Sequence, residues 1–97
     1  MSKKNNRIAM DVVTLVGGSG TATWRDPDTA LGSAIVTIEL EYTPQFVWAT
    51  RTTAGTQTNT QLTFSAITAT GCTITSSSVF DTGVYRVYAV CRAEDFG

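Results

Sequence analysis

The segment "TATGCTITSSSVFDTGVYRVYAVCRA", residues 68–93, carries the clearest structural pattern in this chain of 97 residues. Apolar side chains alternate with threonines in its first half, and with arginine and other large side chains in its second half. Alternation with a period of two is typical of strands that turn one face to a core. The bend between the two runs contains Asp81, Thr82 and Gly83, and Asp and Gly are favoured in tight turns. The segment therefore predicts a β-hairpin that turns between Asp81 and Thr82.

Both cysteines of the chain fall on the expected inward face of this hairpin. Cys72 and Cys91 each lie about ten residues from the bend, so the predicted register places them opposite each other. The cytosol keeps thiols reduced, and free cysteine is among the most buried residue types. The sequence therefore predicts two core thiols rather than a disulfide.

Four other segments show strand patterns. They are residues 8–16, 33–42, 45–52 and 60–67. Glycines at 17–20 end the first of them, since glycine adopts backbone angles that a strand cannot use. No helical period appears between the segments. The expected fold is all-β: a six-stranded antiparallel β-sandwich formed by residues 8–97 as a single domain.

Charge is distributed unevenly along the chain. Residues 1–7 hold Lys3, Lys4 and Arg7, whereas the remaining residues hold four arginines against eight carboxylates, a net charge of −4. A polar basic stretch of this kind predicts a flexible N-terminal arm, suited to docking onto other proteins. The acidic body has no basic stripe, which argues against nucleic acid as the main partner.

Composition also limits the setting in which the protein works. Glu39, Glu41 and the threonines interrupt every apolar stretch well before the ~20 residues that a membrane span needs, and no signal peptide is visible. The absence of lysine after position 4 and the abundance of threonine and serine are more typical of proteins that work outside cells. A virion component made in the host cytoplasm satisfies both observations, and no membrane partner is expected.

Few kinds of catalytic chemistry are open to this chain. It contains no histidine, which excludes Ser-His-Asp, Cys-His and histidine–metal sites, so no cofactor, metal or catalytic residue is expected. Asp81-Thr82-Gly83 matches the tripeptide of aspartic proteases, in which two carboxylates share a proton. Only 14 residues follow Gly83, too few for the flap and strands that such a protease still needs. The protease stays a remote alternative to a simple turn.

Residues 36–93 resemble the H-type lectin domain of snail agglutinins and discoidins. The resemblance rests on "YTPQFVWA" (42–49), "ITATGCTI" (67–74), "DTGVY" (81–85) and "VYAVCRA" (87–93). It implies a six-stranded sandwich that assembles as a trimer. The likeness covers about 60% of the chain.

The resemblance also implies where a ligand would bind. The position of the family's sugar-contacting tryptophan is occupied by Val79, and Phe80 follows it. An aromatic ring stacks on a sugar, while planar charged groups fix its hydroxyls. Arg51, Phe80 and Asp81 are therefore the expected sugar-binding residues, with a cell-surface glycan as the ligand.

A trimer would need a contact surface on each chain. Tyr88 and Val90 lie opposite the expected core set, where an exposed apolar row needs a partner, and we expect them near the threefold axis. The sequence thus predicts a non-enzymatic trimeric structural or adhesive component, such as a phage fibre or capsid decoration. The alternative is a free carbohydrate-binding lectin.

Overall fold

The computed structural model describes residues 7–27, 36–52 and 61–92. In these residues the chain forms six strands and no helix, so the predicted all-β class is confirmed. The strands are β1 (Ile8–Thr14), β2 (Ser19–Thr23), β3 (Phe46–Arg51), β4 (Leu62–Ser65), β5 (Gly71–Ser76) and β6 (Val84–Val90).

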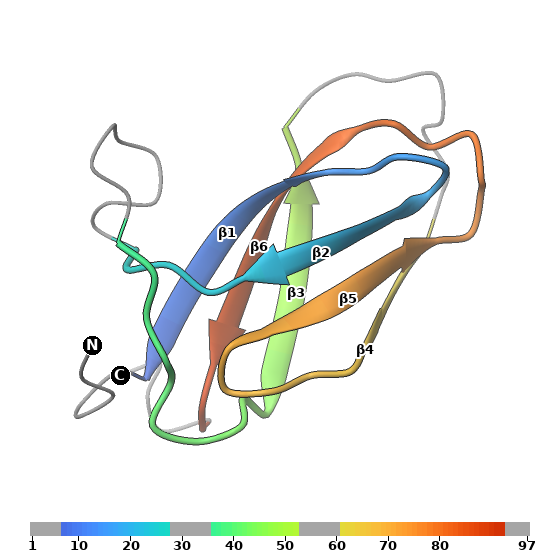
Figure 1. Ribbon diagram of the computed structural model, residues 1–97. Coiled ribbons are helices and arrows are strands. Elements are labelled where there is room, and N and C mark those ends of the chain that lie inside the picture. The colour runs from blue at the N-terminus through green and yellow to red at the C-terminus, as the bar shows by residue number, and fades with distance from the viewer. Residues whose placement is uncertain (1–6, 28–35, 53–60, 93–97) are drawn as a thin grey trace.

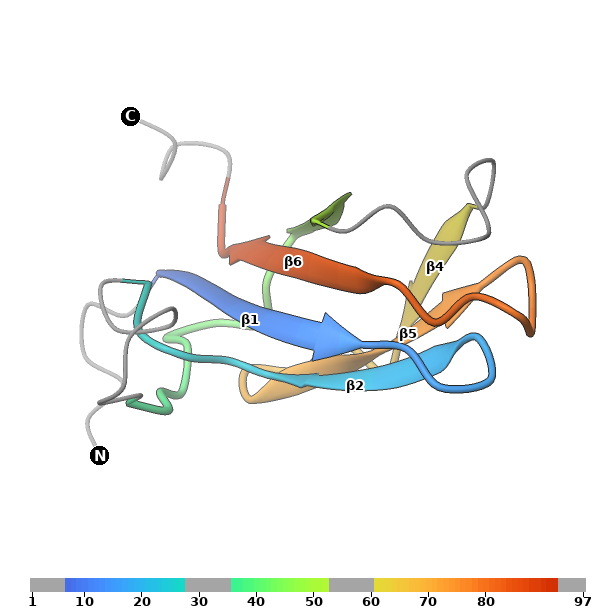
Figure 2. The ribbon, with the colours of Figure 1, turned by 90° about the horizontal axis from the view of Figure 1, so that it is seen from above.

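The strands form two three-stranded sheets stacked as a sandwich. Sheet A has the order β1-β6-β3 and sheet B the order β2-β5-β4, with every neighbouring pair antiparallel. Seen from above, β1 and β6 lie in one layer and β2 and β5 in the other (Figure 2). In the view of Figure 1, sheet B lies in front of sheet A.

A tight glycine turn carries the chain from sheet A to sheet B between β1 and β2. Gly17 and Gly18 have φ angles of 63° and 76°, a region that favours glycine. A Cβ on Gly18 would also lie only 2.3 Å from the Ser78 carbonyl oxygen. The predicted end of the first strand at these glycines is confirmed, and the reason includes a tertiary contact.

The predicted hairpin at Asp81 is wrong. β5 and β6 belong to different sheets, so the segment between them, residues 77–83, crosses from sheet B to sheet A. Cys72 therefore pairs with Ala22 on β2, and Cys91 follows the end of β6, where its N–H donates to the Arg7 carbonyl oxygen. The alternation of β5 and β6 is real, but each strand faces the core from its own layer.

The strand predicted at residues 33–42 is also wrong over the part that the structure describes, because residues 33–35 lie outside it. Residues 36–40 form one isolated bridge, between Thr37 and Arg25, flanked by backbone hydrogen bonds to Trp24 and Asp26, and the Leu40 N–H donates to the Ala69 carbonyl. Sheet B instead takes its edge strand from β2, which follows the glycine turn directly. Ile38 and Leu40 are nevertheless buried, as their alternation predicts.

The core lies between the two sheets and takes alternate residues of each strand. It includes the inward residues of β6 that the sequence predicts. Trp24, which is fully buried just after β2, has the largest side chain in it. The buried members are Ala9, Val13, Leu15, Ala22, Trp24, Ile38, Leu40, Cys72, Ile74, Tyr85, Val87, Ala89 and Cys91.

The predicted basic arm is only partly within the described chain. Residues 1–6 lie outside it. Arg7, assigned to the arm by the sequence analysis, is attached to the sandwich: its backbone carbonyl accepts the Cys91 N–H, and its side chain donates to Glu41 at 3.2 Å. A hydrogen bond from Tyr42, together with this contact from Arg7, lowers the pKa of Glu41.

Candidate functional site

Asp81 lies at the centre of a buried polar network at the crossing between the sheets. Its carboxylate is fully buried and accepts three hydrogen bonds. Ser76 Oγ and Tyr85 Oη donate to Oδ2 at 2.9 and 2.7 Å, and the Gly83 N–H donates to Oδ1 at 2.9 Å. Ser76 ends β5 in sheet B and Tyr85 is the second residue of β6 in sheet A, so the carboxylate joins the two layers.

Arg51, the last residue of β3, completes the network. Its Nη1 lies 3.4 Å from Asp81 Oδ1 and donates to Tyr85 Oη at 2.7 Å. The guanidinium group also lies over the Tyr85 ring, 5.3 Å from its centroid. A Cβ on Gly83 would lie 2.7 Å from the guanidinium carbon, so a larger residue there would have to displace the Arg51 side chain from this position.

The structure thus brings two of the three predicted sugar-binding residues together. Arg51 and Asp81 form an ion pair, but the fully buried Asp81 presents no surface to a ligand. Phe80 is 73% exposed at the tip of the crossing segment, beside Val79 at 69%. Sugar binding by these residues stays a prediction, and the geometry of Asp81 supports a structural role.

A second buried carboxylate, Asp11, was missed by the sequence analysis. It is 3% exposed on the inward face of β1, where Oδ2 accepts the Thr23 N–H at 2.8 Å. Oδ1 accepts the Val12 N–H at 2.8 Å and lies 2.7 Å from Arg25 Nε. The signal that could have revealed it is an aspartate at an inward-facing position of the apolar run "IAMDVV". Asp11 ties β1 to the end of β2.

The two cysteines are free and buried, as the sequence predicts. Burial disfavours the thiolate of Cys72, and the negative charge of Asp11 disfavours it further. Together these effects raise the pKa of Cys72 from 9.0 to about 11. The thiol is therefore unreactive at neutral pH.

This shift gives the stability of the protein a dependence on alkaline pH. The unfolded state ionises its thiol first, so we expect stability to fall as the pH rises from about 9 toward 11. Urea denaturation across this range should show a smaller decline in Cys72→Ala than in the parent protein. Cys91→Ala is the matched control. An identical decline in Cys72→Ala and the parent would contradict the assignment.

The outer face of sheet A carries a group of apolar side chains at one end. Two rows of paired residues cross the three strands there, one from Ile8 through β6 to Phe46 and the next from Met10 through β6 to Trp48. Trp48 stacks on Tyr88, with ring centroids 5.5 Å apart and planes inclined by 23°. We call these six residues the aromatic face: Ile8, Met10, Phe46, Trp48, Tyr88 and Val90.

Exposure varies across the aromatic face. Ile8, Phe46 and Trp48 are 45%, 41% and 37% exposed, and Tyr88 is half-buried. Val90 is only 2% exposed within the single chain, so the expectation that it lies open to solvent is wrong. The exposed apolar surface is provided by the edge strands β1 and β3 rather than by the centre of β6.

The described part of the chain contains no helix long and apolar enough to cross a membrane. It also brings together no group of three or more histidine, cysteine, aspartate or glutamate residues that could hold a metal ion. No family model, curated protein or solved structure matches the chain.

Proposed function

We propose that this protein is a non-enzymatic structural component that assembles as a homotrimer through its aromatic face. The observation that carries the proposal is the exposure of Ile8, Phe46 and Trp48 beside the stacked Tyr88. Contiguous apolar surface of this kind marks a site of association. The virion setting rests on the composition, which is rich in threonine and serine and poor in lysine.

A further copy of the chain is the occupant that best fits the aromatic face. None of the six residues of the aromatic face is charged; Arg86 lies in the next row of sheet A, and Arg25 forms a backbone bridge to Met10 beyond β1. A complementary surface must therefore be apolar and uncharged, and the same face of another copy meets both conditions. β3 is also an edge strand of sheet A, and an apolar edge is prone to pair with other chains unless it is covered.

The size of the face favours a closed ring over a dimer. With three strands of six or seven residues, sheet A has a footprint of about 14 by 23 Å, roughly 300 Å². A stable interface takes about 800 Å² from each partner. A ring allows each copy to contact two neighbours, through its aromatic face and the edge of β3 beside Phe46 and Trp48, which supplies more area.

The test is a comparison of two glutamate substitutions on the outer side of β3. Trp48→Glu places a charge within the aromatic face, whereas Thr50→Glu places one on the same strand and the same side but in the row of Arg86. Light scattering should give the parent and Thr50→Glu three times the chain mass of 10.4 kDa, and Trp48→Glu a single chain. Loss of a central aromatic contact costs about 2 kcal/mol or more of association free energy.

A parent protein of one-chain mass would overturn the proposal, as would a Trp48→Glu variant that assembles like the parent. Val90→Glu is a poorer probe because Val90 is already buried within the chain. Its charge would destabilise the fold and the assembly together. Circular dichroism of both β3 variants should show an unchanged strand signal, which separates loss of assembly from loss of fold.

A further inference from the structure

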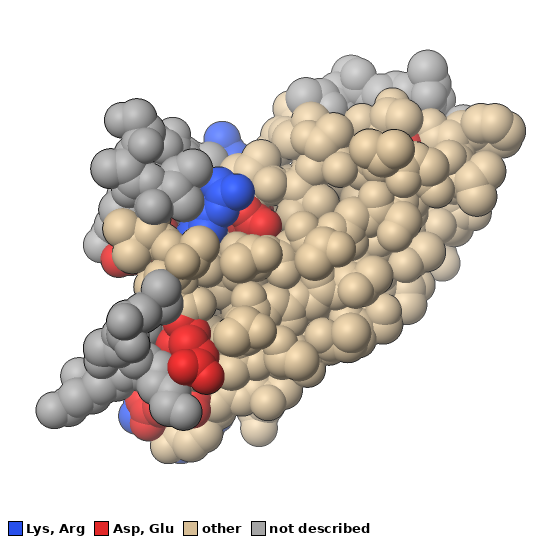
Figure 3. All heavy atoms as spheres, viewed as in Figure 1, with Lys and Arg blue, Asp and Glu red and all other residues tan. Residues whose placement is uncertain are grey.

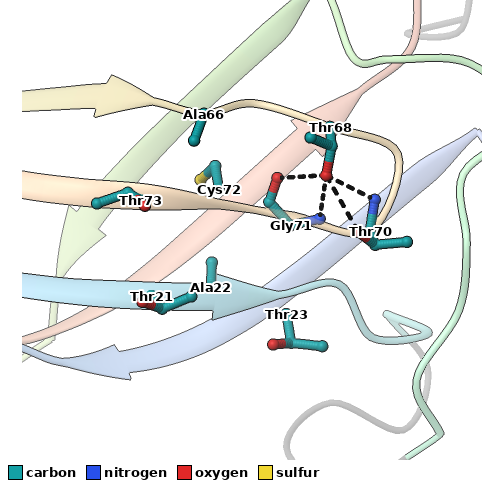
Figure 4. A pocket seen from close by; sticks show the side chains of 9 residues that line it. All are labelled: Thr21, Ala22, Thr23, Ala66, Thr68, Thr70, Gly71, Cys72 and Thr73. Atoms are coloured by element: carbon teal, nitrogen blue, oxygen red, sulfur yellow. Dashed lines mark hydrogen bonds between the residues drawn. The ribbon is translucent and has the colours of Figure 1, made fainter.

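A shallow pocket of about 290 Å³ opens on sheet B, over the paired ends of β2 and β5 (Figure 4). The turn between β4 and β5 forms one of its sides. Ala22 and Cys72 lie in the floor, but their side chains are buried in the core, so they contribute backbone. Gly71 adds no side chain, and a Cβ there would lie 2.1 Å from the Ala22 carbonyl oxygen.

Five of the nine residues that line the pocket are threonines, and none of the nine is charged. Each threonine offers one donor, two acceptor lone pairs and a methyl group. The threonines are Thr21, Thr23, Thr68, Thr70 and Thr73. Figure 3, drawn in the view of Figure 1, shows almost no charged side chains on the surface over β2 and β5. A charged ligand would find no counter-ion here, whereas a neutral polyhydroxyl ligand finds both hydrogen-bond partners and methyl groups.

The side of the pocket formed by the β4–β5 turn is held in place by its own hydrogen bonds. Thr68 Oγ1 accepts the N–H groups of Thr70 and Gly71, each at 3.2 Å, and lies 3.1 Å from Thr70 Oγ1. Ala66, which also lines the pocket, has a φ of 50° and is the only residue other than glycine with positive φ in the described chain. Backbone strain of this kind is concentrated at binding sites.

We propose that this pocket binds one ring of a neutral glycan. Its volume lies at the lower limit of the roughly 300 to 1,000 Å³ found for small-molecule sites, which suits a single sugar ring. Thr21 and Thr73 form a cross-strand pair within the pocket, and hydroxyls continue from this pair along sheet B to Ser65 and then in the row Ser19–Thr75–Thr63, where further sugar units would lie. The proposal rests on sheet B alone and does not depend on assembly through sheet A.

The two surfaces also lie on opposite sides of the sandwich. A trimer formed through the aromatic face would leave three pockets open to solvent. Several weak sugar contacts on one particle would then add through multivalency. Single-site binding in the millimolar range is sufficient for an adhesive role of this kind.

The test is a titration of the full chain, labelled with ¹⁵N, with the methyl glycosides of glucose, galactose, mannose, N-acetylglucosamine and N-acetylgalactosamine. We expect saturable amide shifts at residues 21–23 and 68–73 with at least one neutral glycoside, and none there with sialic acid. A longer oligosaccharide of the same sugar should bind more tightly and also shift Thr63 and Thr75. If a methyl glycoside binds and the longer oligosaccharide does not bind more tightly, the pocket takes a single sugar, and the proposal that further sugar units lie along sheet B is wrong.

Paired valine substitutions provide the control. Thr21→Val with Thr73→Val removes two hydroxyls from the pocket and keeps the branched side-chain shape, so the affinity should fall about tenfold. Thr63→Val with Thr75→Val makes the same change in the neighbouring row, outside the pocket, and should leave monosaccharide binding unchanged. Equal effects of the two pairs, or no saturable shift with any neutral glycoside, would overturn the proposal.

Discussion

Asp81→Ala is expected to lower the free energy of unfolding by about 3 to 5 kcal/mol, because it breaks a buried, hydrogen-bonded ion pair. The substitution leaves the hydroxyls of Ser76 and Tyr85 and the N–H of Gly83 without this acceptor. It also removes the carboxylate that faces Arg51, whose side chain is only 20% exposed. Buried polar groups that lose their partners account for most of the cost.

Urea denaturation at a fixed chain concentration measures this effect, since assembly would make the apparent stability depend on concentration. Thr82→Ala is the control, because Thr82 belongs to the same tripeptide but is exposed. It should change the free energy of unfolding by no more than about 0.5 kcal/mol. A loss below about 1 kcal/mol in Asp81→Ala would show that the network contributes little to the fold.

As a single substitution, Trp24→Ala is expected to lower the free energy of unfolding by about 3 to 5 kcal/mol, as is usual for a fully buried tryptophan. Trp24 fills the space between the sheets at the end of β2. The indole Nε1–H of Trp24 donates to the Thr68 carbonyl at 3.0 Å, and the backbone N–H of Trp24 donates to the Thr70 carbonyl. The alanine variant would leave a large cavity beneath the turn that borders the threonine pocket.

The matched control is Phe80→Ala, which also truncates an aromatic side chain but at a position that is 73% exposed. Thermal denaturation of this variant should resemble that of the parent. In a domain of this size each kcal/mol shifts Tm by about 4 to 8 °C, so Trp24→Ala should melt at least about 12 °C lower. Similar melting temperatures of the two variants would show that the Trp24 side chain contributes little to the stability of the core.

Local pattern was sufficient for most of the strands. β1, β3 and β4 lie within the predicted segments 8–16, 45–52 and 60–67, and β6 lies in the predicted second run. The inward residues of β6 are buried as expected. Alternation predicts these features because each side chain of a strand points to one face or the other, which the neighbouring residues alone decide.

Pairing between strands was the part that local pattern could not supply. A hairpin and a crossing between sheets need the same alternation on both sides of a polar bend. One edge strand of sheet B is β2, which the sequence analysis did not predict, and not a strand at residues 33–42. β2 has poor local signals because glycine and threonine dominate it, but the tight turn at Gly17 and Gly18 places it directly beside β5.

The sequence alone therefore determined an all-β chain with buried thiols and a candidate role for Arg51 and Asp81. Only the tertiary structure decided that these two form a buried pair, that Val90 is covered, and that threonines from β2 and β5 line one pocket. The reason is that burial and ion pairing depend on which backbones exchange hydrogen bonds across long separations in sequence. That exchange is set by the packing of the two sheets as a whole, and no single segment encodes it.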